Sequence, residues 1–456
     1  MPSRPVSLIE TLRARGPSSA RDLGAALGIS QPGVSRALAA ADSRVARIGR
    51  ARRTLYSAVR DVRGLGTEWP LFRIDVQGRP RDFGRLVALY GRGSLMTVAH
   101  PTEWLRHEFV DGLFPRVPWF LEDQRPQGFL GQQSALRWSR DLGLPADILR
   151  WSDDAVLVAL LLYGEDGPGN FVLGERALER ALQQTPETIA VADRERRYDE
   201  LARAALAGEP VGSSAAGEQP KFTAVVEGGD STPRHVIVKF SEPVEGNPAG
   251  RRWADLLICE HLAGQVMAEH GVESAATELV WSQGRVCLEV TRFDRVGQHG
   301  RRGCVTLAAW SDARDGERDD WPAATWRMWH DGWLNEDVQD QVRRRWWFGR
   351  MIGNTDMHFG NLCFFLDDTL PLRLAPNYDM LPMLYRPSGS GAIVHRDYVP
   401  PPPLPADMPY WRQAAEWAEV FWRRVAEHPE VSADFRSVAH ENADAVTRSR
   451  RRFEAP

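Results

Sequence analysis

The chain has 456 residues, a length that accommodates about two to four domains of roughly 100–200 residues each. Its composition, 43% hydrophobic and 26% charged, is that of an ordinary globular protein, and no apolar run approaches the roughly 20 residues of a membrane-spanning helix. The four cysteines are widely scattered without the paired spacing of a metal site, so we expect reduced thiols in a cytoplasmic protein.

The net charge of −4 conceals an asymmetry along the chain. Residues 1–60 contain 11 arginines against three acidic residues, whereas the remainder is acidic. A basic module at one end of an acidic body predicts a contact with nucleic acid at that end alone.

The basic module has the pattern of a winged helix-turn-helix. A helix over 7–15 precedes a second helix that Ser19 can cap and a third helix, over 31–41, that Ser30 can cap. Residues 45–56 then alternate around a glycine turn, as a basic wing hairpin would. The alternative is a small helical bundle whose basic face binds a protein. The residues that we expect to contact DNA are Gln31, Ser35, Arg36, Arg50, Arg52 and Arg53.

Residues 61–200 are expected to form a mixed α/β subdomain. Strand-like runs occur at 71–76 and 86–90, and apolar runs occur at 156–163 and 170–173. No residue of this part predicts a chemistry.

The next hundred residues alternate between strands and one helix. Hairpins are predicted from the pairs of strands at 222–226 with 235–240 and at 277–281 with 285–290, and a helix is predicted over 253–270.

The chain is expected to become helical from about Asn335 and to end in a helical region at about 407–453. The tryptophans between 310 and 347 are interpreted as core or groove aromatics, and the prolines at 400–403 as a surface loop.

Only two of the 57 basic residues are lysines, Lys221 and Lys239, and both lie in the strand-rich segment. Arginine serves where positive charge alone is enough, so the lysines indicate positions that need a compact ammonium group. A loop of small residues at 212–217 leads into the strands that carry them, which is the layout of a nucleotide-phosphate clamp. The alternative is that both lysines survive by chance on a solvated surface. Glu218 stands where a P-loop needs its lysine, which excludes a P-loop NTPase.

A catalytic loop is predicted in the C-terminal part. Asp356 is followed five residues later by Asn361 and then by an apolar strand, which is the spacing of a kinase catalytic loop. The aspartate can accept a proton from an attacking hydroxyl group, and the asparagine amide oxygen can bind Mg²⁺. Asp379 stands where a second metal-binding residue should follow, and such oxygen ligands suit Mg²⁺. An isolated Asp-x-x-x-x-Asn often arises by chance, so the prediction depends on the whole series in order.

These motifs resemble those of the HipA-type serine/threonine kinases, which are toxins of bacterial type II toxin–antitoxin systems. The chain most resembles the YjjJ-like branch, in which a winged helix precedes the kinase. The resemblance implies an α+β, protein-kinase-like HipA fold with a mixed, β-rich N-terminal subdomain and an all-helical C-terminal lobe. The motifs that carry it are Gly217-Glu-Gln-Pro-Lys221, Val238-Lys239, Thr291-Arg-Phe-Asp-Arg295, Asp356-Met-His-Phe-Gly-Asn361 and Tyr378-Asp379.

Four domains are expected from the patterns and the resemblance together. They are a winged helix-turn-helix at 1–60, a HipA-like N-terminal subdomain at 61–200, a nucleotide-binding lobe at 201–295 and a helical catalytic lobe at 296–456.

The resemblance also implies roles for single residues. Asp356 would be the catalytic base, Asn361 and Asp379 would hold Mg²⁺, and Lys239 would contact the α/β-phosphates of ATP. Ser214 matches a serine that the family autophosphorylates, with Ser213 as a near substitute, and its phosphate would be repelled by bound ATP. The alternative is that both serines are merely small loop residues. The implied ATP-binding residues are Ala216, Gly217, Glu218, Gln219, Pro220, Lys221, Lys239, Thr291, Arg292, Phe293, His358, Phe359, Gly360, Asn361, Tyr378 and Asp379.

Two features depart from the family pattern. The acidic residue that should pair with Lys239 is undecided, because Asp255 and Glu260 both lie on the predicted helix. The usual family member relies on a separate helix-turn-helix antitoxin for DNA binding, whereas this chain carries such a module itself. A separate antitoxin and a homodimer therefore stay open as partners.

The principal interpretation is a kinase that uses ATP and Mg²⁺ to phosphorylate a protein hydroxyl group and itself. The family-style target is the translation machinery, such as an aminoacyl-tRNA synthetase. One alternative is a DNA-binding transcriptional regulator whose kinase-like domain senses nucleotide, although the series of Lys239, Asp356, Asn361 and Asp379 argues against an inert domain. Others are a small-molecule kinase and an enzyme that acts on nucleic acid.

Overall fold

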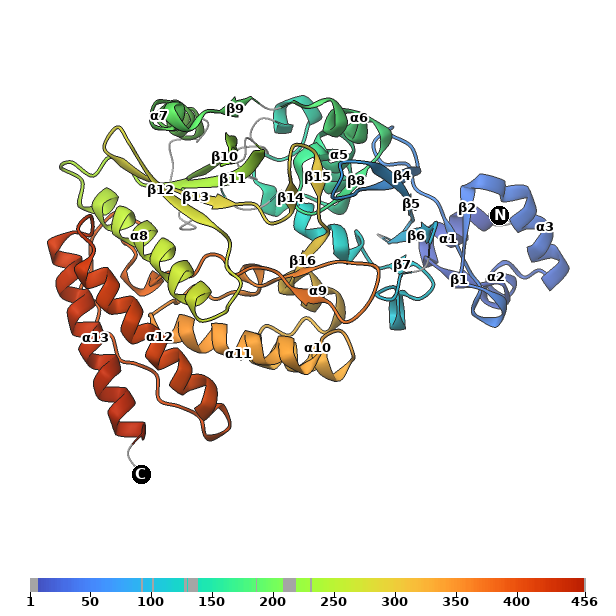
Figure 1. Ribbon diagram of the computed structural model, residues 1–456. Helices are drawn as coiled ribbons and strands as arrows, with labels where there is room; N and C mark the ends of the chain where they lie inside the picture. Colours follow the sequence, from blue (N-terminus) through green and yellow to red (C-terminus); the bar gives the residue numbers. More distant parts are fainter. Residues whose placement is uncertain are drawn as a thin grey trace. The chain divides into compact units, whose positions relative to one another are not determined.

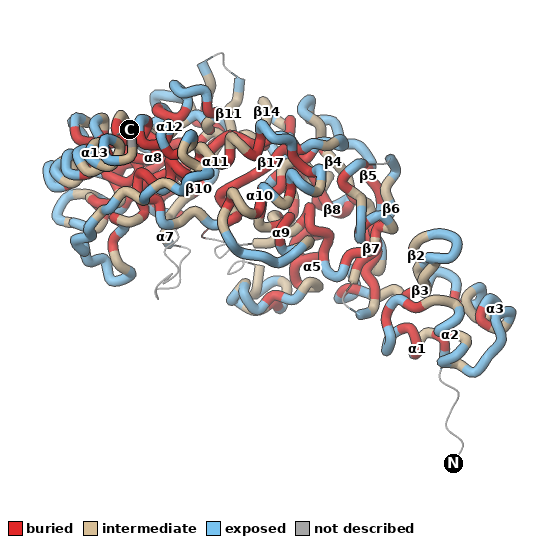
Figure 2. Tube along the Cα trace, turned by 90° about the horizontal axis from the view of Figure 1, so that it is seen from below, coloured by how far each residue is buried: buried red, intermediate tan, exposed pale blue. Residues whose placement is uncertain are grey.

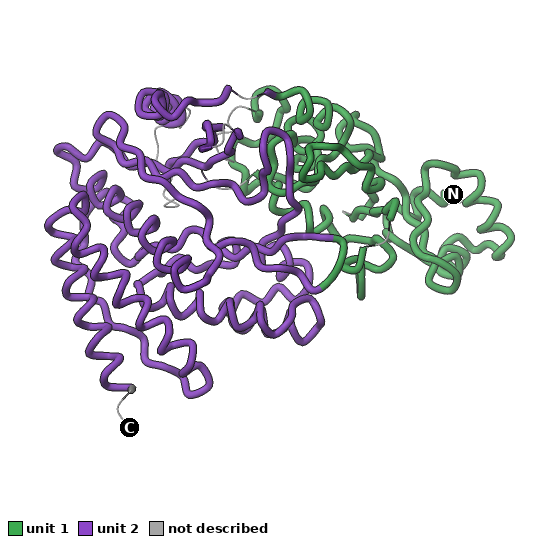
Figure 3. The backbone as a smooth tube through the Cα atoms, viewed as in Figure 1, with its two compact units in different colours: residues 1–126, 138–184, 368–370 green, residues 127–137, 185–367, 371–456 purple. Residues whose placement is uncertain are grey.

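The computed structural model describes residues 7–91, 93–100, 102–126, 129, 138–185, 187–207, 219–229 and 232–454. The chain folds into two compact units (Figure 3). Unit 1 comprises residues 1–126, 138–184 and 368–370, and unit 2 comprises the rest.

Unit 1 begins with the predicted winged helix-turn-helix elements. Ser7 and Ser19 cap the first two helices through their side chains, and Gly28 ends the second in the left-handed conformation at φ 66°. Ser30 occupies the N-cap position of the third helix, as expected, but its side chain makes no capping hydrogen bond. A three-stranded sheet in the order β1-β3-β2 completes the module. The elements are α1 (Leu8–Arg15), β1 (Ser18–Ser19), α2 (Ala20–Leu27), α3 (Gln31–Ala41), β2 (Val45–Ile48) and β3 (Leu55–Ala58).

The rest of unit 1 is a five-stranded antiparallel sheet, in the order β7-β6-β5-β4-β8, with two helices. The predicted strand at 71–76 is part of β4, which begins three residues earlier and ends two residues earlier. The apolar run at 156–163 forms a helix whose N-terminus Ser152 caps. The elements are β4 (Glu68–Ile74), β5 (Pro80–Ala88), β6 (Ser94–Val98), β7 (Leu113–Phe114), α5 (Asp153–Tyr163), β8 (Phe171–Leu173) and α6 (Glu175–Gln183).

The wing hairpin packs on this larger sheet inside unit 1. Ile48 of β2 is 1% exposed and shares a hydrophobic cluster with Val87, Leu89 and Leu95. An isolated β-bridge joins Val59 to Leu89. The wing is therefore part of the core of unit 1 and not a free extension.

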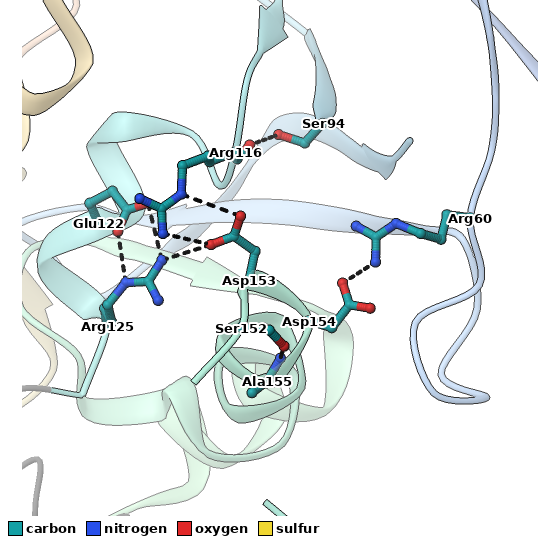
Figure 4. A network of polar contacts seen from close by, with 9 residues as sticks. All are labelled: Arg60, Ser94, Arg116, Glu122, Arg125, Ser152, Asp153, Asp154 and Ala155. Carbon is teal, nitrogen blue, oxygen red and sulfur yellow. Dashed lines mark hydrogen bonds and ion pairs between the residues drawn. The ribbon is translucent and has the colours of Figure 1, made fainter. Parts of the chain in front are cut away.

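An ionic network holds the start of α5 (Figure 4). Asp153 accepts hydrogen bonds at 3.0 Å from both Arg116 and Arg125, and Asp154 pairs with Arg60. Burial raises the pKa of Asp153, but the two guanidinium groups outweigh it, so the pKa lies below its usual value. Since Arg60 follows the wing directly, the network ties the winged helix to α5.

We predict that Ile48→Ala destabilises unit 1 by about 2–5 kcal/mol, because it leaves a cavity between the wing and the larger sheet. Urea unfolding followed by circular dichroism measures the loss. Ile29→Ala is the matched control, since Ile29 is 39% exposed and its loss should be well under half as large. Equal losses would contradict the buried interface.

Unit 2 contains a second five-stranded sheet, in the order β12-β13-β11-β10-β9 (Figure 1). Both predicted hairpins are present, and β9 pairs with β10 in parallel. More than half of the residues of α8 are buried (Figure 2), and the helix begins five residues before the predicted Trp253, because Asn247 caps it and Pro248 fits its first turn. The elements are β9 (Thr188–Ile189), α7 (Arg194–Ala207), β10 (Lys221–Glu227), β11 (Pro233–Phe240), α8 (Pro248–Glu269), β12 (Thr277–Ser282) and β13 (Arg285–Thr291).

The helical part of unit 2 begins before the predicted Asn335. Thr306 and Asp320 cap two helices that precede it. The predicted α+β class is confirmed, but the lobe expected to be all-helical also holds a three-stranded sheet in the order β16-β17-β18. The elements are β14 (Arg295–Val296), β15 (Gly300–Arg301), β16 (Cys304–Thr306), α9 (Leu307–Arg314), α10 (Trp321–His330), α11 (Glu336–Met351), β17 (Cys363–Phe365), β18 (Arg373–Leu374), α12 (Met408–Glu427) and α13 (Ala433–Glu454).

Most tryptophans of this lobe belong to its core, as predicted. Trp310, Trp321 and Trp333 are fully buried, whereas Trp326 and Trp329 of α10 are exposed. Among the described residues, no helix is long and apolar enough to cross a membrane.

Candidate active site

The two lysines of the chain lie directly opposite each other on neighbouring strands. Lys221 begins β10, and the antiparallel register pairs it with Lys239 near the end of β11. Like charges at such positions repel each other, so this pair requires nearby anions. Both lysines lower the pKa of Asp379, which places them around one site. The strand ends therefore form a concentrated cationic position, as the sequence predicted.

Glu260 of α8 is the acidic partner of Lys239. Lys239 Nζ donates to both carboxylate oxygens of Glu260, at 2.6 and 2.7 Å, and both side chains are almost fully buried. Asp255, the other candidate, instead accepts hydrogen bonds from the backbone and hydroxyl groups of Ser432, at 2.8 and 2.6 Å. The structure therefore resolves the choice that the sequence left open.

Asp379 is the second partner of the Lys239 ammonium group. Its backbone has φ 55°, a left-handed conformation that is uncommon outside glycine and often found at functional sites. Burial lowers the pKa of Lys239, but Asp379 and Glu260 raise it by more, so the pKa lies above its usual value. Burial likewise raises the pKa of Asp379, and the neighbouring lysines outweigh it, so that carboxyl group stays ionised.

The predicted catalytic loop is held together by two asparagine side chains. Asn354 Oδ1 accepts from the Asp356 amide at 3.0 Å, and its Nδ2 donates to the Asp379 carbonyl at 3.3 Å. Asn361 Nδ2 donates to the Asp356 carbonyl at 2.9 Å. Asn354 thus joins the loop of the candidate base to the loop of the candidate metal ligand. The sequence interpretation missed this residue, although its position two residues before Asp356 was a usable signal.

The donor set fits Mg²⁺. Because the Asn361 amide nitrogen is bonded to the loop, its amide oxygen is the atom left to face a metal ion. Asp379 supplies a carboxylate that is 30% exposed. The described residues contain no group of three or more His, Cys, Asp or Glu side chains placed to hold a metal ion. A hard cation at this site would therefore need oxygen ligands from a nucleotide as well.

Aromatic rings gather where the resemblance places adenine. The rings of Phe293 and Tyr378 lie 5.7 Å apart, and Phe293 also contacts Phe365. The Tyr378 hydroxyl donates to the Gly360 carbonyl at 2.7 Å, which fixes its ring beside the catalytic loop. Thr291, the first hinge residue, accepts a hydrogen bond from Arg234 at 3.0 Å.

Further predicted residues surround the catalytic loop or precede β10. His358 Nδ1 accepts from the Gly360 amide at 3.0 Å, and Phe359 is buried. Arg292 forms an ion pair with Asp294. Gln219 and Pro220 lead directly into Lys221. The predicted Ser213, Ser214, Ala216, Gly217 and Glu218 lie outside the described residues.

The predicted DNA contacts lie in unit 1. Gln31, Ser35 and Arg36 are exposed on α3, as a recognition helix requires. Arg50 and Arg52 of the wing are exposed as well, whereas Arg53 pairs with Asp111 at 2.6 Å.

We predict that Glu260→Gln destabilises unit 2 by about 3 kcal/mol at pH 7, the lower end of the usual cost of breaking a buried ion pair, because Asp379 still balances Lys239. Urea unfolding measures it. Glu269→Gln on the same helix is the control, since that half-exposed carboxylate pairs with Arg424 at the surface and should contribute under about 1 kcal/mol. Similar losses for both variants would contradict the prediction.

Comparisons with known proteins agree with the sequence motifs. A family model for the YjjJ-like toxin middle domain matches residues 65–182, and one for the HipA-like C-terminal domain matches residues 213–448. The chain is 37% identical over 444 residues to the protein named Toxin YjjJ from Escherichia coli (strain K12), and the match covers 97% of each chain.

Two solved structures are more distantly similar. One is the complex of the Shewanella oneidensis MR-1 toxin–antitoxin proteins HipA and HipB with operator DNA (16% identity, 74% of this chain, 85% of that chain, TM-score 0.44). The other is the Helicobacter pylori proinflammatory kinase CtkA (12% identity, 53% of this chain, 90% of that chain, TM-score 0.35). The family models and the E. coli relative carry the assignment: the chain belongs to the HipA-like family, in its YjjJ-like branch.

Proposed function

We propose that this protein is an ATP- and Mg²⁺-dependent serine/threonine protein kinase. The observation that carries the proposal is the buried Lys239 ammonium group held between Glu260 and Asp379. Kinases use such a lysine and glutamate pair beside a metal-binding aspartate to position the phosphates of ATP. The loop of Asp356 and Asn361 is bonded to the same aspartate through Asn354, so all the required groups converge.

The residues would divide the work of phosphoryl transfer among them. Asp356 would orient the acceptor hydroxyl group and accept its proton, while Lys239 and Lys221 would neutralise phosphate oxygens. Asn361 and Asp379 would hold Mg²⁺, which supplies charge neutralisation at the transferred phosphoryl group. Most of the rate enhancement would come from positioning and electrostatics, because no covalent intermediate is needed.

We expect Asp356→Asn to lower the rate of phosphoryl transfer by about 10²–10⁴-fold, the usual contribution of a general base. The pure protein is incubated with γ-labelled ATP and Mg²⁺, and phosphorylated residues are mapped by mass spectrometry. Asp337→Asn, an exposed residue at the start of α11, is the matched control and should retain the wild-type rate. Unchanged transfer by pure Asp356→Asn would rule out the assigned base.

The same experiment separates the alternatives. Label on Ser214 or Ser213 would support autophosphorylation as a switch that turns the kinase off. ATP binding without any transfer would favour a nucleotide-sensing regulator. Transfer to sugars or aminoglycosides without labelled protein would favour a small-molecule kinase.

We propose further that the kinase acts as the toxin of a type II toxin–antitoxin system. The E. coli relative, which matches nearly the whole chain, is named a toxin. The family-style target, translation machinery such as an aminoacyl-tRNA synthetase, and a separate antitoxin are the partners that this function would require.

A second proposed activity is DNA binding by the winged helix. The supporting observation is the exposed polar face of α3, which carries Gln31, Ser35 and Arg36 on a basic module. A helix placed this way enters the major groove in other helix-turn-helix proteins.

We expect Arg36→Ala to weaken binding to duplex DNA and to reduce the salt dependence of log Kd by about one, as the loss of one phosphate contact does. Fluorescence anisotropy over a salt series measures both quantities. Arg203→Ala, an exposed arginine of α7, is the control that should leave them unchanged. Equal effects of the two substitutions would count against this surface.

A further inference from the structure

A coil that follows the candidate metal loop exposes both apolar side chains and backbone groups. Ile393, Val394 and Val399 are 37%, 46% and 79% exposed. Within the described part of the chain, no backbone N–H or C=O group of residues 393–400 bonds to another backbone group. Such a segment offers a polypeptide both hydrogen bonds and apolar contact.

The coil is anchored rather than loose at its C-terminal end. The Tyr398 hydroxyl group donates to the Met351 carbonyl at the end of α11, and Trp411 Nε1 donates to the Pro401 carbonyl at 2.8 Å. Prolines at 400–403 restrict the backbone to extended conformations, and Val399, which precedes them, is restricted as well. Little conformational entropy would therefore be lost when a ligand binds along it.

The anchored end of the coil shares a pocket with the candidate base. Tyr398, Val399 and Pro401 line this pocket of about 700 Å³ together with Asp356 and Trp346. The volume is that of a typical ligand site and accommodates a few amino-acid side chains. A hydroxyl group bound here lies beside the carboxylate that would accept its proton.

We propose that residues 393–401 are the docking platform for the acceptor, an extended polypeptide segment with an apolar residue next to its serine or threonine. The segment would bond to the free backbone groups as an added strand, and its apolar side chain would pack on Val399. This inference rests on the proposed kinase function. It goes beyond that function by assigning an acceptor class and the residues that select it.

The reaction balances with the groups already named. The acceptor hydroxyl oxygen forms a bond to the γ-phosphorus of ATP, and the bond from that phosphorus to the β–γ bridging oxygen breaks. The electron pair of the broken bond leaves with ADP, and the hydroxyl proton passes to Asp356. The platform takes no part in these steps and only places the hydroxyl group.

The platform favours a polypeptide over a small polar acceptor. A sugar would leave the apolar surface of Val394 and Val399 uncovered and would use few of the backbone groups. Charges in the pocket are mixed, with Arg350 and Asp397 among its lining residues, so neither a strongly basic nor a strongly acidic segment is favoured. Apolar side chains are therefore the feature that the platform can select.

The test uses the full chain with a serine peptide library in which each flanking position carries leucine, aspartate or lysine in turn. We expect leucine at one flanking position to raise kcat/KM, and Val399→Asp to lower kcat/KM for that peptide about tenfold or more. The loss should fall on the peptide KM, with the KM for ATP unchanged. Leu149→Asp introduces the same charge at a site that is 91% exposed in unit 1, and should keep the wild-type preference.

The outcomes separate this proposal from the proposed function. An unchanged peptide preference in Val399→Asp would overturn the platform while the kinase function stands. Transfer to a second copy carrying Asp356→Asn, with no peptide labelled, would make another copy of the chain the occupant and would also overturn it. Absence of both ATP binding and ADP formation in the wild-type chain would instead refute the kinase function.

Discussion

A single buried cation organises the catalytic part of this protein. The ammonium group of Lys239 lies on a central strand of the unit 2 sheet, where burial without partners would cost several kcal/mol. Its two carboxylates come from α8 and from the loop after β18, segments separated from it by 21 and 140 residues. Satisfying one charge therefore fixes the helix, the sheet and the metal loop relative to one another. The same requirement keeps both lysines among 57 basic residues, because a guanidinium group would not fit between the two carboxylates.

The residues that the sequence predicted well are those identified by spacing along the chain. Asp356, Asn361 and Asp379 follow each other at family-like intervals, and the structure brings them to one site. The partner of Lys239 could not be chosen in this way, because Asp255 and Glu260 are five residues apart and so about 140° apart around the helix. Only the packing of α8 on the sheet decides which of them faces the lysine. Asn354 was missed because its role is a pair of backbone contacts, which leave no motif.

Local signals explain the errors in the elements themselves. Helices α9 and α10 were missed since each is short and rich in tryptophan, so that their periodicity is weak, although Thr306 and Asp320 are recognisable caps. The short sheet of β16, β17 and β18 escaped the all-helical interpretation because its strands have only two or three residues. Such strands exist through their tertiary neighbours rather than through intrinsic preference.

The packing of the wing on the larger sheet of unit 1 has a practical meaning for anyone who dissects the protein. A fragment that ends at residue 60 would carry the whole helix-turn-helix pattern, yet it would uncover Ile48 and break the bonds of Arg60 to Leu89 and Asp154. Exposed apolar surface of this kind promotes self-association. A soluble DNA-binding fragment would have to extend through the β4–β8 sheet and α5, so in this chain the sequence motif is smaller than the piece of protein that can fold around it.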